Sequence, residues 1–185
     1  MWRALFALAG THGLRRGEAL AVRWQNVDLD SSTLSVVRTL HHPKGGGYEF
    51  SEPKTKNGTR KVRLAEHVVR ELRAHRAEQR EARLGVGPAW TDEDLVFANE
   101  YGRPLGEDKV TENFHRALDR AELPRIRFHD LRHTAATVMM GLGVHPKMVQ
   151  ETLGHGNVGI TLDIYSHVTP DMQQDAVDKL NQRYG

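Results

Sequence analysis

One short segment combines an arginine and histidines in a pattern that could bind an anionic ester. It reads HDLRH at positions 129–133. On a helix, His129 and Arg132 are three residues apart and point to one side. A guanidinium fork and an imidazole at a helix N-terminus favour negative charge, so the segment suits an oxyanion. The alternative is a surface helix start that carries these residues by chance.

The spacing of His129 and His133 also raises the question of a zinc site. The glutamate of an HExxH motif is missing, the chain has no cysteine, and Arg132 places a cation between the two imidazoles. The sequence therefore argues against zinc here.

A second segment sets a carboxylate three residues after an arginine. It reads GLRRGE at positions 13–18. Glu18 can hold the Arg15 guanidinium or cap the first amides of the following helix. An oriented guanidinium of this kind suits a phosphate, whereas a plain capping arrangement would need no ligand.

A third segment, PKTKNG at positions 53–58, carries a pair of lysines at the tip of an expected hairpin. Such lysines are usually exposed charge that keeps a sheet edge soluble. A hairpin tip can also reach into a DNA groove, where an ammonium group could protonate a leaving oxygen.

The fourth segment runs from LGH at positions 153–155 to a tyrosine ten residues later. Ile160 and Ile164 share a core-facing side, which puts Tyr165 on the adjacent side, one turn beyond Thr161. A single tyrosine there is ordinarily a packed aromatic whose hydroxyl is hydrogen-bonded.

Helices and one small sheet must position these segments. Apolar spacing and turn residues predict helices over 2–9, 16–24, 65–83, 108–121, 129–142, 146–153, 157–165 and 170–182. Strands are predicted over 33–40, 48–51 and 60–64, joined as a three-stranded antiparallel meander through glycine-containing turns. The fold class is mainly α with a small three-stranded antiparallel β-sheet (α+β).

Two local expectations follow from these helices. Pro146 suits the first turn of its helix, and Gly154 suits its C-terminal cap. Along 129–142, the core-facing side is expected to carry Leu131, Ala135, Val138 and Leu142.

Length and composition set wider limits on the class of protein. The 185 residues suffice for one domain over 1–185, and a net charge of +2 with eleven histidines slightly favours a nucleic-acid partner. No apolar run approaches the roughly 20 residues of a membrane span, and residues 1–10 lack the features of a signal peptide. The absence of cysteine fits a reducing cytosol, so we expect a cytoplasmic protein without a membrane partner.

The order of the four segments resembles the tyrosine recombinase (phage integrase) family. GLRxxE, a lysine-bearing hairpin, HxLRHT, LGH and the tyrosine carry the resemblance, which runs from about Leu5 to the C-terminus. It implies a tyrosine recombinase catalytic-domain-like fold and catalytic roles for Arg15, Lys54, His129, Arg132, His155 and Tyr165. Lys54 is preferred to Lys56 as the hairpin lysine, and Glu18 and His133 are supporting residues.

The resemblance also implies a reaction and its partners. Tyr165 would attack a DNA phosphodiester to form a 3′-phosphotyrosyl intermediate, with no metal, ATP or other cofactor. The partner would be double-stranded DNA, bound by a homotetramer, with a monomer as the isolated domain and an accessory directionality factor as a further partner. Helix 170–184 would dock on a neighbouring protomer, or else pack within its own chain.

The resemblance leads us to expect that the N-terminal core-binding domain of family members is absent, and that DNA binding is weak and salt-sensitive. The rival functions are a type IB topoisomerase, a catalytically silent DNA-binding module and a histidine-based metallonuclease. The last would need carboxylates near the histidines, and only Asp130 and Asp163 are even loosely placed. The DNA site and the biological outcome (integration, excision or dimer resolution) stay open.

Overall fold

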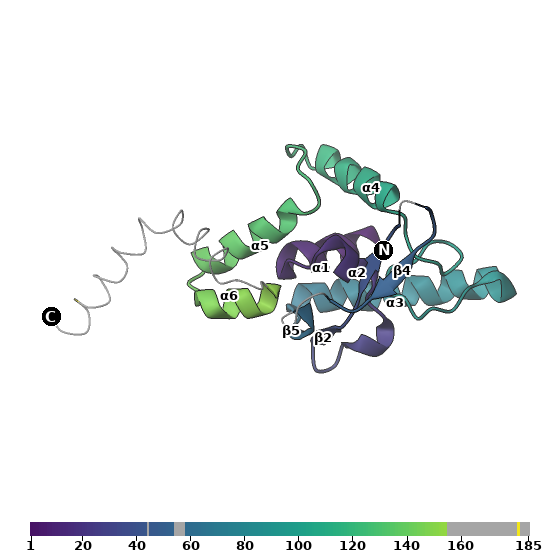
Figure 1. The fold of residues 1–185 in the computed structure, drawn as a ribbon, viewed down its shortest axis with the longest axis horizontal. Helices are drawn as coiled ribbons and strands as arrows, with labels where there is room; N and C mark the ends of the chain where they lie inside the picture. The colour runs from purple at the N-terminus through teal and green to yellow at the C-terminus, as the bar shows by residue number, and fades with distance from the viewer. Residues whose placement is uncertain (44, 54–57, 155–180, 182–185) are drawn as a thin grey trace.

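A computed structural model describes residues 1–43, 45–53, 58–154 and 181. Helix α1 (Trp2–His12) lies at the centre of the fold, between α3 (Glu66–Val86) and α5 (Asp130–Gly141) (Figure 1). Its buried residues recur at helical spacing, and they are Ala4, Leu5, Leu8, Ala9 and His12. The helix is three residues longer than the predicted 2–9 and ends where Gly13 adopts a left-handed conformation (φ 63°, ψ 32°).

Helix α2 (Arg16–Leu20) is shorter than the predicted helix over 16–24. The residues after it pair with another segment: Val96 donates its backbone N–H to Val22 O (2.9 Å), and Trp24 donates to Asp94 O (2.9 Å). These backbone groups are therefore lost to the helix, and the chain continues as a 3-10 turn over Trp24–Asn26.

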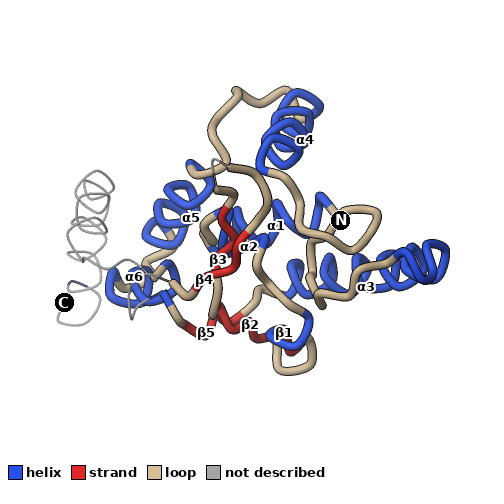
Figure 2. Tube along the Cα trace, turned by 45° about the vertical axis from the view of Figure 1, so that its right-hand side comes forward, coloured by secondary structure: helices blue, strands red, loops and turns tan. Residues whose placement is uncertain are grey.

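The strands form two antiparallel groups, which Figure 2 shows in red. Strands β1 (Val27–Asp28), β2 (Thr33–Val36) and β5 (Arg60–Arg63) make a three-stranded sheet in the order β1-β2-β5. Strands β3 (Thr39–His41) and β4 (Glu49–Ser51) pair separately. The small three-stranded antiparallel sheet is confirmed, but the meander is wrong, because β2 pairs directly with β5 and β4 pairs only with β3.

The predicted strand over 33–40 divides because its second half turns toward α2. Strand β3 contacts α2 at Gly17, where a Cβ atom would lie 2.6 Å from the Leu40 carbonyl oxygen and 2.6 Å from Thr39 Oγ1. Only a glycine permits this close approach. The β3–β4 hairpin is thus packed on α2, outside the sheet that contains β2 and β5.

The remaining helices follow the predicted boundaries closely. Helix α4 (Glu107–Arg120), α5 and α6 (Pro146–Leu153) match the predictions, whereas α3 continues three residues past the predicted 65–83 before a 3-10 turn over Gly87–Ala89. Pro146 occupies the first turn of α6, and Gly154 caps it in the left-handed region (φ 71°, ψ 43°), as predicted. The predicted helices over 157–165 and 170–182 lie outside the described residues, apart from Asn181.

Within the described residues, the core has one large and one small apolar cluster. The large cluster joins α1, α2, α3, α4 and the β1-β2-β5 sheet, and the small one joins α5 to α6 through Ala136, Met140, Val149 and Leu153. The predicted core face of 129–142 is wrong at Val138 and Leu142, which are 53% and 78% exposed. Helix α5 packs on α1 and α6 together, so its buried stripe is Arg132, Ala135, Ala136 and Met140. In the part of the chain that the structure describes, no helix is long and apolar enough to cross a membrane.

Candidate active site

The start of α2, the start of β5, α5 and the end of α6 meet around one buried carboxylate. Arg132 extends from α5 and donates from Nη1 to the Gly13 carbonyl oxygen at 2.7 Å. Arg15 lies at the N-cap of α2, and its Nη2 lies 3.5 Å from the carbonyl oxygen of Gly154 at the end of α6. The α1–α2 junction is therefore tied to both C-terminal helices of the described chain.

Glu18 is the carboxylate at the centre of this cluster, and only 3% of its side chain is exposed. Its Oε2 accepts the Arg15 backbone N–H (2.9 Å), and its Oε1 accepts from Arg15 Nη1 (2.7 Å). Both roles considered from the sequence are present, because Glu18 holds the Arg15 guanidinium and also caps the start of α2 by accepting the Arg15 backbone N–H. Arg60 adds a second guanidinium, which donates to both Glu18 oxygens at 2.9 and 3.3 Å.

Competing effects act on the pKa of Glu18. Burial by itself raises it, but the hydrogen bonds and positive charge of Arg60, together with those of Arg15, outweigh burial and hold the pKa below its ordinary value. Glu18 is therefore ionised at neutral pH.

Arg132 is a buried cation beside other cations. Burial and the neighbouring charges of Arg15 and Arg60, partly offset by Glu18, lower its pKa to about 9. It remains charged at neutral pH, so among the described residues of this cluster three guanidiniums accompany one carboxylate. The Arg15 side chain is 42% exposed, which leaves this positively charged cluster accessible to an anion from solvent.

His129 stands at the N-cap of α5, beside the arginines. Its ring centroid lies 5.5 Å from that of His133, with the rings nearly perpendicular. Partial burial, then the charges of His133, Arg132 and Arg15, lower the pKa of His129. The imidazole is therefore neutral at neutral pH and able to accept a proton.

The remaining predicted site residues lie outside the described residues. These are Lys54, its alternative Lys56, His155 and Tyr165. The structure brings together Arg15, Glu18 and Arg132, with His129 and His133 at the start of the helix that carries Arg132. Gly58 and Gly154, which border the undescribed stretches, both lie at this cluster.

The residue that sequence reasoning missed is Arg60. A signal was present, because side chains alternate along a strand and Arg60 shares a face with the buried Val62. An arginine at an inward strand position needs a buried acceptor. Its partner Glu18 is 42 residues away in the sequence, so the pairing itself was not visible.

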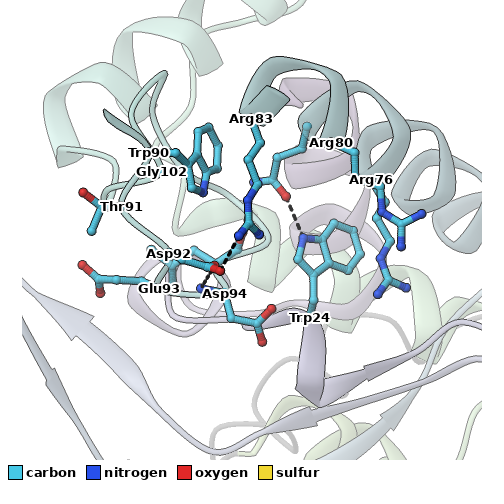
Figure 3. A pocket seen from close by; sticks show the side chains of 12 residues that line it. Trp24, Arg76, Arg80, Arg83, Trp90, Thr91, Asp92, Glu93, Asp94 and Gly102 are labelled. Atoms are coloured by element: carbon cyan, nitrogen blue, oxygen red, sulfur yellow. Dashed lines mark hydrogen bonds and ion pairs between the residues drawn. The ribbon is translucent and has the colours of Figure 1, made fainter. Parts of the chain in front are cut away.

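A separate hollow of about 190 Å³ lies between α3 and the 90–94 segment (Figure 3). Arg83 pairs with Asp92 (2.7 Å), Trp24 Nε1 donates to Gln79 (2.7 Å), and Arg76 lies over the Trp24 ring (5.0 Å). These lining side chains thus pair with one another, and none of the site residues that the structure describes lines the hollow.

Comparison of the sequence with known proteins identifies the family to which this chain is similar. The model of the phage integrase family matches residues 1–172. A tyrosine recombinase XerC-like protein of Caldanaerobacter subterraneus subsp. tengcongensis is 37% identical over 98% of this chain and 49% of its own length. The ICEBs1 integrase of Bacillus subtilis is 27% identical, also over 98% of this chain and 49% of its own length.

Solved structures agree with the sequence relatives. The Tn1549 transposon integrase in complex with a circular intermediate DNA superposes with a TM-score of 0.79 at 25% identity, over 95% of this chain and 57% of that one. The XerH site-specific recombinase, bound to a palindromic difH substrate in a post-cleavage complex, superposes with a TM-score of 0.67 at 25% identity. The match covers 95% of this chain and 44% of that one. The expected tyrosine recombinase catalytic-domain-like fold is thereby confirmed.

The chain spans about half the length of the curated relatives it matches. The family match nevertheless covers nearly all of it, and includes Arg15, Glu18, Arg132 and Tyr165. The chain belongs to the phage integrase family of tyrosine recombinases.

Proposed function

We propose that residues 1–185 are the catalytic domain of a site-specific DNA recombinase, which cleaves and rejoins strands through a covalent tyrosyl–DNA intermediate. The observation that supports this most is the Arg15–Arg132 pair, brought from two distant segments to one centre with an excess of positive charge. A phosphodiester in its pentavalent transition state gathers negative charge on its non-bridging oxygens, and fixed guanidiniums stabilise that charge.

Each candidate residue has a role in the proposed step. The phenol oxygen of Tyr165 attacks phosphorus, the bond to the 5′ oxygen breaks, and the 3′ phosphate remains on the tyrosine. A tyrosine with an ordinary pKa of about 10 needs a proton acceptor, and neutral His129 is the candidate. Lys54 would protonate the departing 5′ oxygen, and His155 would donate a further hydrogen bond to the phosphate. Attack by a 5′-hydroxyl reverses the step, and the proposed reaction requires neither ATP nor a divalent ion.

The proposal extends to partners and assembly. The substrate is double-stranded DNA, and exchange between two duplexes requires four protomers, with helix 170–184 as the docking segment between neighbours. The isolated domain would be a monomer in the cytoplasm, and an accessory directionality factor would act on the assembled complex. Relaxation of supercoiled plasmid without any specific site would favour a type IB topoisomerase instead.

A covalent-adduct assay tests the centre of this proposal. The chain is incubated in EDTA with a library of nicked duplexes that carry a randomised core, and protein–DNA adducts are isolated on a denaturing gel and sequenced. We expect an adduct that Tyr165→Phe abolishes and that Tyr101→Phe, a change at an exposed tyrosine, preserves. The assignment is wrong if no adduct forms, if a divalent ion is required, or if the adduct survives Tyr165→Phe.

A further inference from the structure

We propose that Arg60 is a positioning residue, which sets the orientation of Arg15 through Glu18 and holds the ends of two site-bearing segments against α2. This inference rests on the proposed function. It adds a residue to the site that contacts protein groups rather than the DNA phosphate.

The contacts of Arg60 join three parts of the chain that are far apart in sequence. Its Nε donates to the carbonyl oxygen of Thr152 in α6 (2.7 Å), and its Nη1 donates to the carbonyl oxygen of Gly58 (3.1 Å). Nη1 and Nη2 also donate to the two oxygens of Glu18. All three guanidinium nitrogens therefore bind protein acceptors.

The sequence neighbours of these acceptors give the contacts their significance. Gly58 directly follows residues 54–57, which include Lys54, and Thr152 stands three residues before His155. Glu18 in turn holds Arg15 by its side chain and by its backbone N–H. One side chain thus contacts the carboxylate that holds Arg15 and two backbone carbonyls that lie close in sequence to Lys54 and His155.

Exposure separates the role of Arg60 from that of Arg15. The Arg60 side chain is 6% exposed and is surrounded by its acceptors, whereas 42% of the Arg15 side chain is exposed. Of these two guanidiniums, Arg15 is therefore the one that an entering phosphate can reach. Arg60 shares the negative charge of Glu18 with Arg15 and fixes the position of the carboxylate. Glu18 therefore orients Arg15 but neutralises its positive charge only in part.

The geometry requires an arginine and not merely a positive charge. A planar guanidinium reaches both Glu18 oxygens and two carbonyls at once, whereas a lysine ammonium is a single point donor. With lysine at position 60, Glu18 and the two carbonyls cannot all be held in place, and Arg15 would settle more deeply on Glu18. Misplacement of a catalytic group by about 1 Å can cost on the order of 10²-fold in rate.

The test compares Arg60→Lys with Arg63→Lys, the same change at an exposed position of the same strand. Adduct formation on a nicked duplex selected by the wild-type chain is measured in single turnover as a function of DNA concentration. For Arg60→Lys we expect the maximal rate to fall about 10–100-fold while the half-saturating DNA concentration stays within about threefold. Arg63→Lys should match the wild type in maximal rate.

A double-substitution cycle shows whether Arg60 acts through Glu18. Because Glu18→Gln removes the group that Arg60 positions, the maximal rate of Arg60→Lys/Glu18→Gln should be close to that of the slower single variant. Multiplicative losses would overturn the proposal, as would an unchanged rate in Arg60→Lys. A raised half-saturating concentration with an unchanged maximal rate would also overturn it, because that result indicates a direct DNA contact.

Circular dichroism and thermal unfolding of each variant separate positioning from folding. If the fractional loss of rate in Arg60→Lys equals the fraction of that variant that is unfolded at the assay temperature, Arg60 is merely structural and the inference is wrong. Failure of the proposed function is seen separately, as the absence of any adduct from the wild-type chain.

Discussion

The Glu18 carboxylate accepts hydrogen bonds from two guanidiniums and one backbone amide while it is almost fully buried. A buried charge of this kind is tolerated only because its partners compensate the loss of hydration. Removal of the carboxylate would leave buried Arg60 beside Arg15 and Arg132, and the described part of the chain offers Arg60 no other ion-pair partner. The residue is therefore important for folding as well as for the orientation of Arg15.

We predict that Glu18→Gln lowers the free energy of unfolding by about 3–5 kcal/mol, the usual cost of breaking a buried ion pair on one side. Urea denaturation of the purified chain measures it. The control is Glu112→Gln, which breaks an exposed i,i+4 pair with Arg116 and should cost under about 1 kcal/mol. Equal stability of the two variants would contradict the prediction.

A second residue-scale prediction concerns the pH dependence of the proposed strand cleavage. The pKa of His129 is lowered, so the imidazole is a neutral acceptor at neutral pH and gains a proton only at a pH below that at which an ordinary histidine does. The rate of adduct formation should be flat near neutrality and fall in acid as His129 becomes protonated.

His129→Asn should slow adduct formation and remove this acid limb, while His41→Asn, at an exposed histidine, should keep it. Circular dichroism at each pH checks that the chain stays folded. An acid limb that persists unchanged in His129→Asn would assign the titration to another group.

The cluster also shows which pairings a sequence can predict. The link between Arg15 and Glu18 was predictable because the two residues are three apart at a helix start, where local geometry fixes their approach. The link between Glu18 and Arg60 depends on how β5 is placed against α2, and no local pattern encodes that distance.

At the scale of elements, α5 differs from its expected orientation. Its apolar residues fit more than one helical stripe, and the observed stripe is set by simultaneous packing on α1 and α6. Arg132 therefore points inward with Ala135 and Ala136, while Val138 points outward. The helix boundaries were predictable from local signals such as Pro146 and Gly154, but the face that packs was not, because it depends on two partners.

Gly13 joins these elements and gives the element-scale prediction. It has φ +63°, and a Cβ atom there would lie 2.2 Å from Leu153 Cδ2 of α6. We predict that Gly13→Ala lowers the free energy of unfolding by roughly 2 kcal/mol or more, from left-handed strain and from displacement of α6.

Chemical denaturation compares this variant with Gly85→Ala, inside α3, where an added Cβ meets nothing within 4 Å. Because alanine is the better helix former, Gly85→Ala should leave stability unchanged or raise it by up to about 1 kcal/mol. A neutral Gly13→Ala would mean that Leu153 of α6 moves away from the added Cβ atom at little cost.

At the scale of the whole molecule, the order of helices, the α+β class and the separate segments of the site were predictable from the sequence. Apolar periodicity and turn residues determine those features locally. The division of the strands into two groups was not predictable, because it follows from the close contact of Gly17 with β3. Lys54, His155 and Tyr165 lie outside the described residues, so their place in the site stays a prediction.

Global stability should depend on pH through His12. This histidine lies where α1 ends against the start of α3, and its Nε2 accepts the Ala65 backbone N–H at 3.2 Å. Burial, and then the charge of His67, lower the pKa of His12 to about 4. Since the unfolded chain takes up this proton near pH 6.5, the stabilisation is complete above that pH and is lost progressively down to about pH 4.

Denaturation curves at a series of pH values should show an acid loss on the order of 3 kcal/mol from this group. His12→Gln should be less stable at pH 7 but should show a flatter pH dependence, and exposed His41→Gln should behave as the wild type. An undiminished slope in His12→Gln would place the titrating group elsewhere.

The positive charge gathered around Glu18 has a consequence for the chain without DNA. Arg15, Arg60 and Arg132 repel one another in the folded state, and an anion bound between them would relieve that repulsion. Sulfate at about ten times its dissociation constant should therefore raise the melting temperature by about 3–5 °C over sodium chloride of equal ionic strength, and Arg15→Gln should reduce this gain. Under the proposed function, a DNA phosphate would take the place of the sulfate, and DNA binding would then stabilise the folded chain in the same way.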